Sequence, residues 1–514
     1  MNLQVALTSL IWIAAAWWCV LSGVAAEEPG RPPNIILMMA DDLGVHDLAS
    51  YGQRGFTTPH TDRLAREGMR FTDAHSPSAI CSPTRYAVVT GTDPFRRYHM
   101  SHVLFNGEPL VIGKQEATVA SLLKQQGYWS GVVGKWHLGL GDTLPRDLNR
   151  PGRGPNDIGF DYSYLVPDGH NMLPLYYLEN GEVEGGTEEP FRSKARLLDR
   201  VGYKLVQNEP LGDWENRRPN HAIGARLADR VDAFLERNRE RPFFLYYPTC
   251  SIHFPTTPDR RFVGQSGIGP HGDYVMEFDW AVGRVLATLD RLGLADDTLL
   301  IVTSDNGGYP ARDAMRGHDP NHPWRGAKSS ALEGGHRVPL LARWSGRVAP
   351  GTVSGQTVSL VDMTATFCAI ADAPLPADAA LDSFDLLPIL LGQAGEEPLR
   401  PYTVMGTRGM AELVLRRGPW KLIVAPQRDR VRLYHLDDDP REERDLSGKK
   451  PEIVGQLRGL LGQYVGSGSS RPGSEATGTT LESLFRQRDR RNRQLLDWEA
   501  NGFPPVDVRQ LEIN

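Results

Sequence analysis

The 514-residue sequence predicts an α/β fold, in which a large mixed, mostly parallel sheet flanked by helices precedes a smaller C-terminal antiparallel sheet. Two observations predict this arrangement. Apolar runs at residues 33–40, 241–247 and 298–304 end directly before polar residues, which is typical of strands buried on both faces of a parallel sheet. The stretches between these runs show helical spacing, whereas residues 401–446 alternate between short strands and turns.

The composition argues against some classes of protein. Charged residues make up 23% of the chain, hydrophobic residues make up 40%, and the formal net charge is −6. This balance argues against a nucleic-acid-binding protein and gives no strong electrostatic field toward anionic polymers. Any site for an anionic substrate must therefore be a local cluster of cations.

The N-terminal residues 1–26 contain no Asp, Glu, Lys or Arg and include an apolar run around Trp12. They end in Val24, Ala25 and Ala26, so we expect a cleaved signal peptide and export to a periplasmic, secreted or lumenal location. An uncleaved anchor is the alternative, because a basic segment is missing before the apolar run. No later run approaches the length of a membrane span, so we expect no stable membrane insertion.

Three further parts are expected after the signal peptide. A catalytic domain would cover residues 27–395, a C-terminal α+β subdomain residues 396–465, and a linker and tail residues 466–514. The linker is predicted from the Gly- and Ser-rich composition of residues 466–478. The basic stretch at 481–498 is interpreted as a solvated, partly packed tail.

The chain has four cysteines, which fall into three groups. Cys19 would leave with the signal peptide, and Cys81 belongs to a motif described below. We expect Cys250 and Cys368 to be buried thiols, with one disulfide between them as the alternative.

Oxygen-bearing side chains follow two of the predicted buried strands. Asp41 and Asp42 come directly after the first apolar run, and Asp305 and Asn306 directly after the last. Open α/β sheets place ligands at the carboxyl ends of their strands, and hard oxygen ligands favour Ca²⁺ or Mg²⁺. The alternatives are a helix N-cap or Asx-turn for the first pair and a type I′ turn for the second. Residues 309–323, however, supply no partner strand for a hairpin.

The segment at residues 76–85 ends in the pentapeptide Cys-Ser-Pro-Thr-Arg, which runs from Cys81 to Arg85. Pro83 suits the first turn of a helix, where its missing N–H has little effect. A helix that begins here would hold Cys81 at its positive end, close to an anionic substrate. The alternative is a buried free cysteine beside a helix start.

Candidate cations come from further helix–strand units. Residues 118–128 predict a helix that ends at glycine, and a strand at 129–133 leads to Lys135 and His137. By themselves a Lys and a His at a strand end are usually surface residues. His253 follows the strand at 241–247 and would ordinarily be a loop residue.

The remaining stretches are assigned from composition and periodicity. We expect a helix at residues 58–68, helices at 222–236 and 274–292, and long loops that carry substrate specificity at 140–220. Within those loops, the polar residues 168–171, including Asp168 and His170, either touch substrate or are simply loop polarity. The predicted elements end with a helix that begins near residue 362 and short strands at 412–416, 420–424 and 431–435.

Several of these motifs resemble, in order, those of type I sulfatases. Cys-Ser-Pro-Thr-Arg at residues 81–85 resembles the signature Cys-X-Pro-X-Arg of that family. The chain also resembles it in Asp-Asp-Leu-Gly at 41–44, Gly-Lys-Trp-His-Leu-Gly at 134–139 and His-Phe-Pro at 253–255. The segments around Lys328 resemble the third lysine segment of the family. A departure occurs after Thr90, where the family pattern Thr-Gly-Arg is Thr-Gly-Thr.

The resemblance implies the alkaline-phosphatase-like fold and a modified nucleophile. In this family a maturase oxidises the signature cysteine, here Cys81, to Cα-formylglycine (3-oxoalanine). The hydrated aldehyde carries two hydroxyls, so that one can attack sulfur and the other can then expel sulfate. A serine at this position would lack that second hydroxyl.

The resemblance also assigns roles to individual residues. A Ca²⁺ ion would be held by Asp41, Asp42, Asp305, Asn306 and the hydrated residue 81. Arg85 would hold the hydrate, and Lys135, His253 and Lys328 would bind sulfate. His253 or Lys328 would protonate the leaving alcohol. His137 would take the proton of the second hydroxyl.

The sequence therefore predicts a sulfuric ester hydrolase that cleaves sulfate monoesters of glycans or aryl alcohols. Its expected partners are a sulfated small molecule or glycan and a formylglycine-generating maturase, with no nucleic acid. One alternative is a phosphonate or phosphate ester hydrolase of the same superfamily. The other is a non-catalytic binder of sulfated glycans in which Cys81 stays unconverted.

Overall fold

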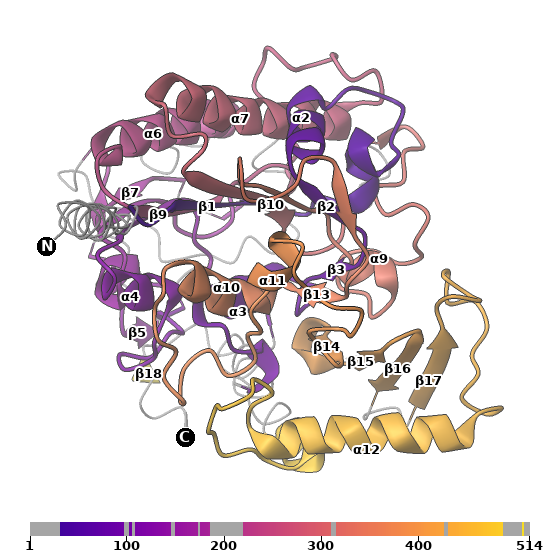
Figure 1. Cartoon of the computed structure of the whole chain (residues 1–514). Coiled ribbons are helices and arrows are strands. Elements are labelled where there is room, and N and C mark those ends of the chain that lie inside the picture. Colours follow the sequence, from indigo (N-terminus) through magenta and orange to yellow (C-terminus); the bar gives the residue numbers. More distant parts are fainter. Residues whose placement is uncertain are drawn as a thin grey trace, which may run out of the picture. The chain divides into compact units, whose positions relative to one another are not determined.

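A mixed sheet forms the centre of the computed structural model, and ten strands belong to it among the described residues (Figure 1). In spatial order these are β12 (Thr352–Ser354), β2 (Met69–Phe71), β11 (Leu340–Arg343), β10 (Thr298–Ser304), β1 (Asn34–Ala40), β9 (Phe243–Pro248), β4 (Trp129–Lys135), β6 (Tyr162–Val166), β7 (Leu178–Glu179) and β8 (Glu182–Val183). The central pairs from β10 to β6 are parallel, and antiparallel pairs flank them. The predicted mixed, mostly parallel sheet is confirmed.

The structure describes residues 31–96, 102–104, 108–144, 150–172, 175–185, 219–309, 315–425, 430–486 and 506–507. All described elements belong to the unit Pro33–Asn514. The predicted signal peptide, much of the predicted loop region at 140–220 and most of the C-terminal tail lie outside the described residues.

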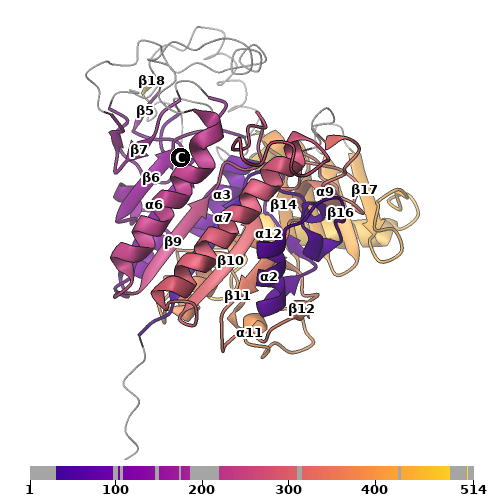
Figure 2. The same ribbon diagram turned by 90° about the horizontal axis from the view of Figure 1, so that it is seen from above.

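Helices cover both faces of the sheet (Figures 1 and 2). On one face lie α2 (Pro59–Glu67), α6 (Ile223–Asn238) and α7 (Pro270–Leu292), and on the other lie α3 (Cys81–Thr90), α4 (Val119–Lys124) and α10 (Met363–Ile370). The short helices are α9 (Glu333–His336) and α11 (Leu387–Leu390), with 3-10 turns at Val45–Asp47, Ala49–Tyr51, Pro94–Arg96, Pro155–Ile158, Asn220–Ala222, Leu360–Asp362 and Arg408–Met410.

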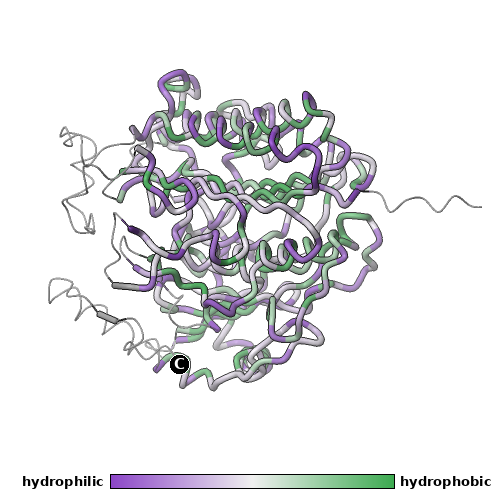
Figure 3. Tube along the Cα trace, turned by 90° about the vertical axis from the view of Figure 1, so that its left-hand side faces the viewer, coloured by the Kyte–Doolittle hydropathy of each residue, from purple (hydrophilic) through white to green (hydrophobic). Residues whose placement is uncertain are grey.

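The alternation of side chains along β1 explains why both faces need cover. Ile35, Leu37 and Met39 belong to the hydrophobic core on one face, together with residues of α3 and α4. Ile36 and Met38 belong to the core on the other face, with residues of α6 and α7. All seven residues of β1 are buried, as expected for a central parallel strand. Green, hydrophobic stretches of the chain run through the interior of the tube in Figure 3.

Several elements differ from the sequence prediction. The strand expected at residues 129–133 continues to Lys135, because β4 pairs with β6 over Gly131 to Lys135. The expectation of loops throughout 140–220 is wrong for β6, whose residues after Tyr162 are all buried against neighbouring strands. Helix α7 begins at Pro270, four residues earlier than expected, with proline in its first turn.

A second sheet follows in the C-terminal part of the chain. It contains β14 (Thr403–Gly406), β15 (Leu413–Arg417), β16 (Trp420–Ala425) and β17 (Arg430–His435), all antiparallel in that order. Helix α12 (Pro451–Ser467) packs on it through Leu457 and Leu461 (Figure 1). The antiparallel C-terminal sheet is confirmed, but β14 and α12 were not predicted. A separate two-stranded pairing joins β3 (Ala74–His75) to β13 (Val358–Ser359), and another joins β5 (Thr143–Leu144) to β18 (Val506–Asp507).

The Gly- and Ser-rich segment after α12 lies against residues 377–381. The backbone N–H groups of Ser470 and Arg471 both donate to the carbonyl of Leu381, and that of Glu475 donates to Ala377. Residues 470, 471 and 475 of this segment thus have backbone partners in residues 377–381.

Cys250 and Cys368 are both buried thiols, as the sequence predicted. They belong to the two cores on opposite faces of the sheet, which explains why no disulfide joins them. Among the described helices, none is both long and apolar enough to cross a membrane.

Candidate functional site

The candidate site lies where four parallel strands end at one edge of the sheet. Ala40 of β1 pairs with Ser304 of β10, so that the next residues, Asp41 and Asp305, are neighbours. The N–H of Asp305 donates to the carbonyl of Ala40 at 3.1 Å. Strands β9 and β4 follow in order, and they bring the His253 loop and Lys135 to the same edge.

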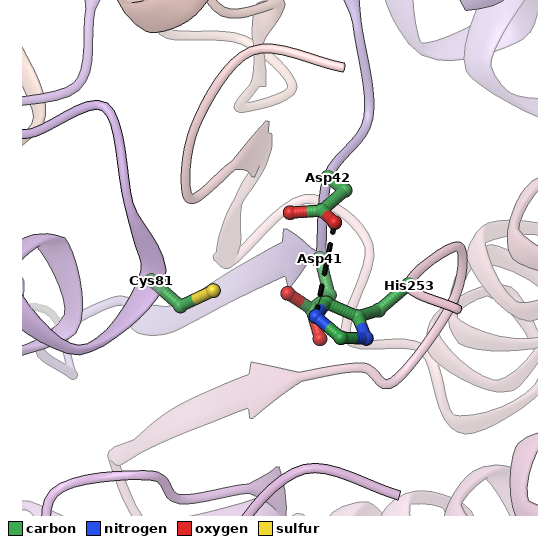
Figure 4. A group of neighbouring side chains, drawn as sticks. All are labelled: Asp41, Asp42, Cys81 and His253. Carbon is green, nitrogen blue, oxygen red and sulfur yellow. Dashed lines mark ion pairs between the residues drawn. The ribbon is translucent and has the colours of Figure 1, made fainter. Parts of the chain in front are cut away.

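The oxygen-bearing side chains predicted to bind a cation lie together. The N–H of Asp42 donates to Asp305 Oδ1 at 3.1 Å, and Asn306 Nδ2 donates to Asp42 Oδ1 at 2.8 Å. Asp41, Asp42, Cys81 and His253 each place a potential ligand atom within 4.8 Å of those of the others. Figure 4 shows the Cys81 side chain pointing toward the two aspartates.

Three cations, of which Arg85 and Lys135 are buried and Lys328 is largely buried, balance the three buried carboxylates. Lys135 Nζ lies 2.6 Å from Asp41 Oδ2, and Lys328 Nζ lies 2.6 Å from Asp42 Oδ1. Arg85 Nη2 donates to Asp305 Oδ2 at 2.7 Å, and its Nη1 donates to the carbonyl of Lys135. The isolated burial of any of these charges would be strongly unfavourable, so the cluster is stable only as a set.

The pKa values report this competition between burial and charge. Burial and the nearby Asp41 raise the pKa of Asp305 to about 6, despite its pairing with Arg85. Burial also favours the neutral form of Asp41, but Lys135 and the other cations hold the pKa of Asp41 well below its ordinary value. Three carboxylates this close together can therefore stay ionised only with positive charge beside them.

The donor set fits a hard divalent cation such as Ca²⁺. Asp41 Oδ1 and Asn306 Oδ1 are buried and accept no hydrogen bond from the described residues. Buried oxygens normally have partners, so two unpaired ones beside two further carboxylates indicate a cation site. The backbone of Asp42 has a φ of 70°, in the left-handed region, which is strain of the kind found at ligand-binding turns.

Cys81 is the first residue of α3, as the sequence predicted, and Pro83 lies in the first turn. Burial raises the pKa of the Cys81 thiol to about 12, even though Lys135 and Lys328 favour the thiolate. An unmodified Cys81 would therefore remain a protonated thiol, which is a poor nucleophile.

His137 lies two residues beyond the end of β4, with a φ of 56°. Its Nε2 donates to the carbonyl of Leu104 at 2.9 Å, because a carbonyl can only accept. Its Nδ1 therefore carries a lone pair, and within the described residues this buried atom has no donor. Burial, together with Lys135 and Arg85, lowers the pKa of His137 well below its ordinary value.

His253 faces the aspartates from the loop after β9. Its Nε2 lies 3.9 Å from Asp42 Oδ2 (Figure 4). Its Nδ1 donates to the carbonyl of Phe254. Burial, and then Lys328, lowers the pKa of His253 well below its ordinary value. His170, from the polar residues 168–171, packs against His253 with ring centroids 5.7 Å apart, so this stretch does reach the site.

Sequence reasoning missed the elements that hold the Cys81 loop. The carbonyl of Gly406, at the end of β14, accepts hydrogen bonds from the N–H of Ala79 and from Ser78 Oγ. The carbonyl of Ala79 accepts from the N–H of Ser329, which ties the loop to the Lys328 segment. Strand β14 has four residues and no distinctive motif, so the sequence alone carries no signal of this contact.

A model of one protein family, described as Sulfatase, matches residues 33–373 of the chain. The chain belongs to the sulfatase family. This sulfatase is 35% identical over 482 residues to the N-acetylgalactosamine-6-O-sulfatase of Bacteroides thetaiotaomicron, a match that covers 84% of this chain and 93% of that protein. It is 38% identical over 477 residues to the arylsulfatase A of Homo sapiens, with coverage of 86% and 89%.

A solved structure from a study of the metabolism of multiple glycosaminoglycans by Bacteroides thetaiotaomicron has a TM-score of 0.77 to this sulfatase. The two are 33% identical, and the match covers 84% of this chain and 99% of the other. The predicted fold family is therefore confirmed. The protein is a sulfuric ester hydrolase, as the names of its relatives over most of its length indicate.

Replacing Asp305 by Ala should test the buried charge balance. In calcium-free buffer, above the pKa of about 6 of Asp305, the free energy of unfolding should fall by up to about 3–5 kcal/mol, because buried Arg85 would lose its closest carboxylate and keep only Asp41 Oδ1 at 3.6 Å. Urea denaturation measures this change. The matched control is Asp290→Ala, whose partner Arg63 is partly exposed, and which should lose only about 0.2–1 kcal/mol. An equal loss in the two variants would contradict the account.

Proposed function

We propose that the enzyme hydrolyses sulfate monoesters with a formylglycine made from Cys81 and a calcium ion. The observation that carries the proposal is the position of Cys81. It begins a helix, and its Sγ shares one cluster with Asp41, Asp42 and His253, beside the buried Lys135 and the largely buried Lys328.

The two groups would supply a nucleophile and positive charge. Formylglycine at position 81 would supply a hydrated aldehyde, one hydroxyl of which can attack sulfur. The calcium ion would add two positive charges to a cluster whose six charged side chains balance one another, and thereby attract an anionic ester. The residues that would hold calcium are Asp41, Asp42, Asp305 and Asn306, with residue 81 as a further ligand.

Lys135 and Lys328 are proposed to bind the sulfate oxygens. They reach the cluster from the end of β4 and from the loop between β10 and β11, so they approach from two directions. Negative charge grows on these oxygens in the transition state, and buried, preorganised donors stabilise it more than they stabilise the bound substrate. Arg85 is proposed to orient residue 81 from the same pocket.

Two histidines would handle the protons. Nε2 of His253 is the ring atom that faces the site, so His253 is placed to bind sulfate and, with Lys328 as the other candidate, to protonate the leaving oxygen. Nδ1 of His137 carries a buried lone pair and could accept the proton of the second hydroxyl.

The substrates proposed are sulfated glycans or aryl sulfates. One relative is named an N-acetylgalactosamine-6-O-sulfatase and another an arylsulfatase, and both match most of this chain. Export through residues 1–26, the action of a maturase on residues 81–85 and the domain limits at 395 and 465 are part of the same proposal.

The direct test compares a sulfate monoester and a phosphonate monoester of one phenol, together with a panel of defined sulfated oligosaccharides. We expect the purified, calcium-loaded enzyme to have a higher kcat/KM for the sulfate ester and to release sulfate from at least one oligosaccharide. A preference for the phosphonate would favour the related hydrolase. Binding of sulfated glycans with no release of sulfate would favour a non-catalytic binder.

Lys135→Ala and Lys328→Ala should each lower kcat by about 10²–10³-fold, or about 2.7–4 kcal/mol, because each removes one donor from a preorganised anion site. The loss should appear mainly in kcat, since the charge they stabilise grows toward the transition state. Steady-state kinetics measures it, and mass spectrometry of the residue 81 peptide should show unchanged conversion.

The control for this pair is Lys124→Ala, at a mostly exposed lysine that pairs with the largely buried Asp161 outside the site. Its kcat should match that of the wild type. Near-normal kcat in Lys135→Ala and Lys328→Ala at full conversion of residue 81 would show that these lysines do not bind the sulfate.

A further inference from the structure

A second cluster of metal-ligating side chains lies outside the proposed sulfate site. His271 Nε2 and His318 Nε2 each lie 2.8 Å from Asp47 Oδ1. The three ligand atoms lie within 4.8 Å of one another, Asp47 and His271 are buried, and His318 is largely buried. Nothing in the proposed reaction uses these residues.

The donors differ from those of the oxygen-rich cluster. Two imidazole nitrogens and one carboxylate oxygen are ligands of zinc and similar first-row metals, whereas Ca²⁺ prefers oxygen alone. Zinc binds such atoms at about 2.0–2.2 Å, so ligand atoms about 3–4 Å apart can share one ion. At present each Nε2–H donates a hydrogen bond to Asp47 Oδ1, so metal binding requires both Nε2 atoms to give up their protons and the rings to move slightly outward.

The electrostatic surroundings also permit a cation. Within 4.0 Å of the Asp47 carboxylate, the charged partners in the described part of the chain are the two histidines. Among the described residues, the Asp47 carboxylate thus faces imidazole rings and no lysine or arginine, which leaves it available as a metal ligand.

A third histidine-containing cluster shows the contrast. His75, Glu333 and His336 also lie close together. There, however, Lys421 Nζ lies 2.9 Å from Glu333 Oε1 and 3.0 Å from His336 Nε2, and Arg416 Nη1 lies 2.9 Å from His75 Nε2. Two cationic side chains already occupy the positions that a metal ion would take. That cluster is a saturated ion-pair network.

The Asp47 cluster joins three distant segments of the chain. Asp47 lies in the 3-10 turn just after Asp42, and its Oδ2 accepts from the N–H of Gly44 at 2.8 Å. His271 is in the first turn of α7. His318 precedes Pro320, whose carbonyl accepts from the N–H of His46.

We propose that Asp47, His271 and His318 bind one divalent transition-metal ion, with zinc as the probe. The fourth position of a tetrahedral site is open to water, because this group contains three ligating side chains among the described residues. A bound metal ion would connect the turn that follows Asp41 and Asp42 with α7. It would also connect this turn with the segment that precedes Lys328. This inference does not depend on the proposed sulfatase chemistry.

The test titrates metal-free enzyme with zinc and measures retained zinc by elemental mass spectrometry after gel filtration. The wild type should retain one equivalent of zinc. The Asp42→Asn variant, which is altered in the oxygen-rich site, should retain it too. His271→Gln and His318→Gln should raise the Kd at least about tenfold, since even outer partners of a metal ligand contribute 10–100-fold to affinity. The matched control is His435→Gln, which removes a surface His–Asp pair, His435 with Asp438.

The position of the ion is tested separately on the wild-type protein. Crystals soaked in zinc should give an anomalous peak at the zinc edge between Asp47 Oδ1 and the two Nε2 atoms. This measurement does not require the variants to fold. Absence of retained zinc in the wild type, or equal zinc in the His271→Gln, His318→Gln and His435→Gln variants, would overturn the proposal and leave a hydrogen-bonded cluster only.

Discussion

The structure depends on a balance of buried charge at the carboxyl edge of the sheet. Asp41, Asp42 and Asp305 are each at most 2% exposed, and each is paired with a lysine or an arginine, Asp41 with both Lys135 and Arg85. Removing such groups from water is unfavourable by several kcal/mol each, so they must be held at short distance from one another. The parallel pairing of β10, β1, β9 and β4 provides that constraint, because it ends all four strands at one place.

The C-terminal sheet belongs to the same arrangement. Gly406 of β14 holds the backbone just before Cys81, and Ser329 holds it from the Lys328 side. The buried network of Glu333 with Lys421 then joins β16 to α9. The position of residue 81 is therefore set by both sheets. A change in the C-terminal sheet should reach the site through the Cys81 loop.

The sequence predicted most of the site because its residues follow buried strands. Asp41 and Asp305 end apolar runs, and Cys81 begins a helix marked by Pro83. It could not predict which lysine pairs with which aspartate, since that depends on side-chain positions that only packing decides. It also missed the Asp47 cluster, because His271 and His318 lie 224 and 271 residues after Asp47 in the chain and form no local sequence motif. Strand β6 was missed because it has only five residues and includes the polar but buried Ser163, so it lacks the continuous apolar run that marks the other buried strands.

The account rests on residue 81 as the nucleophile, so the decisive measurement combines its mass with activity in the same preparations. Conversion of Cys81 to formylglycine should lower the mass of its tryptic peptide by about 18 Da, the change from CH₂SH to CHO. We predict that sulfate release rises in proportion to the converted fraction across preparations made with and without a maturase. Cys81→Ser should show no sustained turnover. Full activity in a preparation whose Cys81 is entirely thiol would contradict the account.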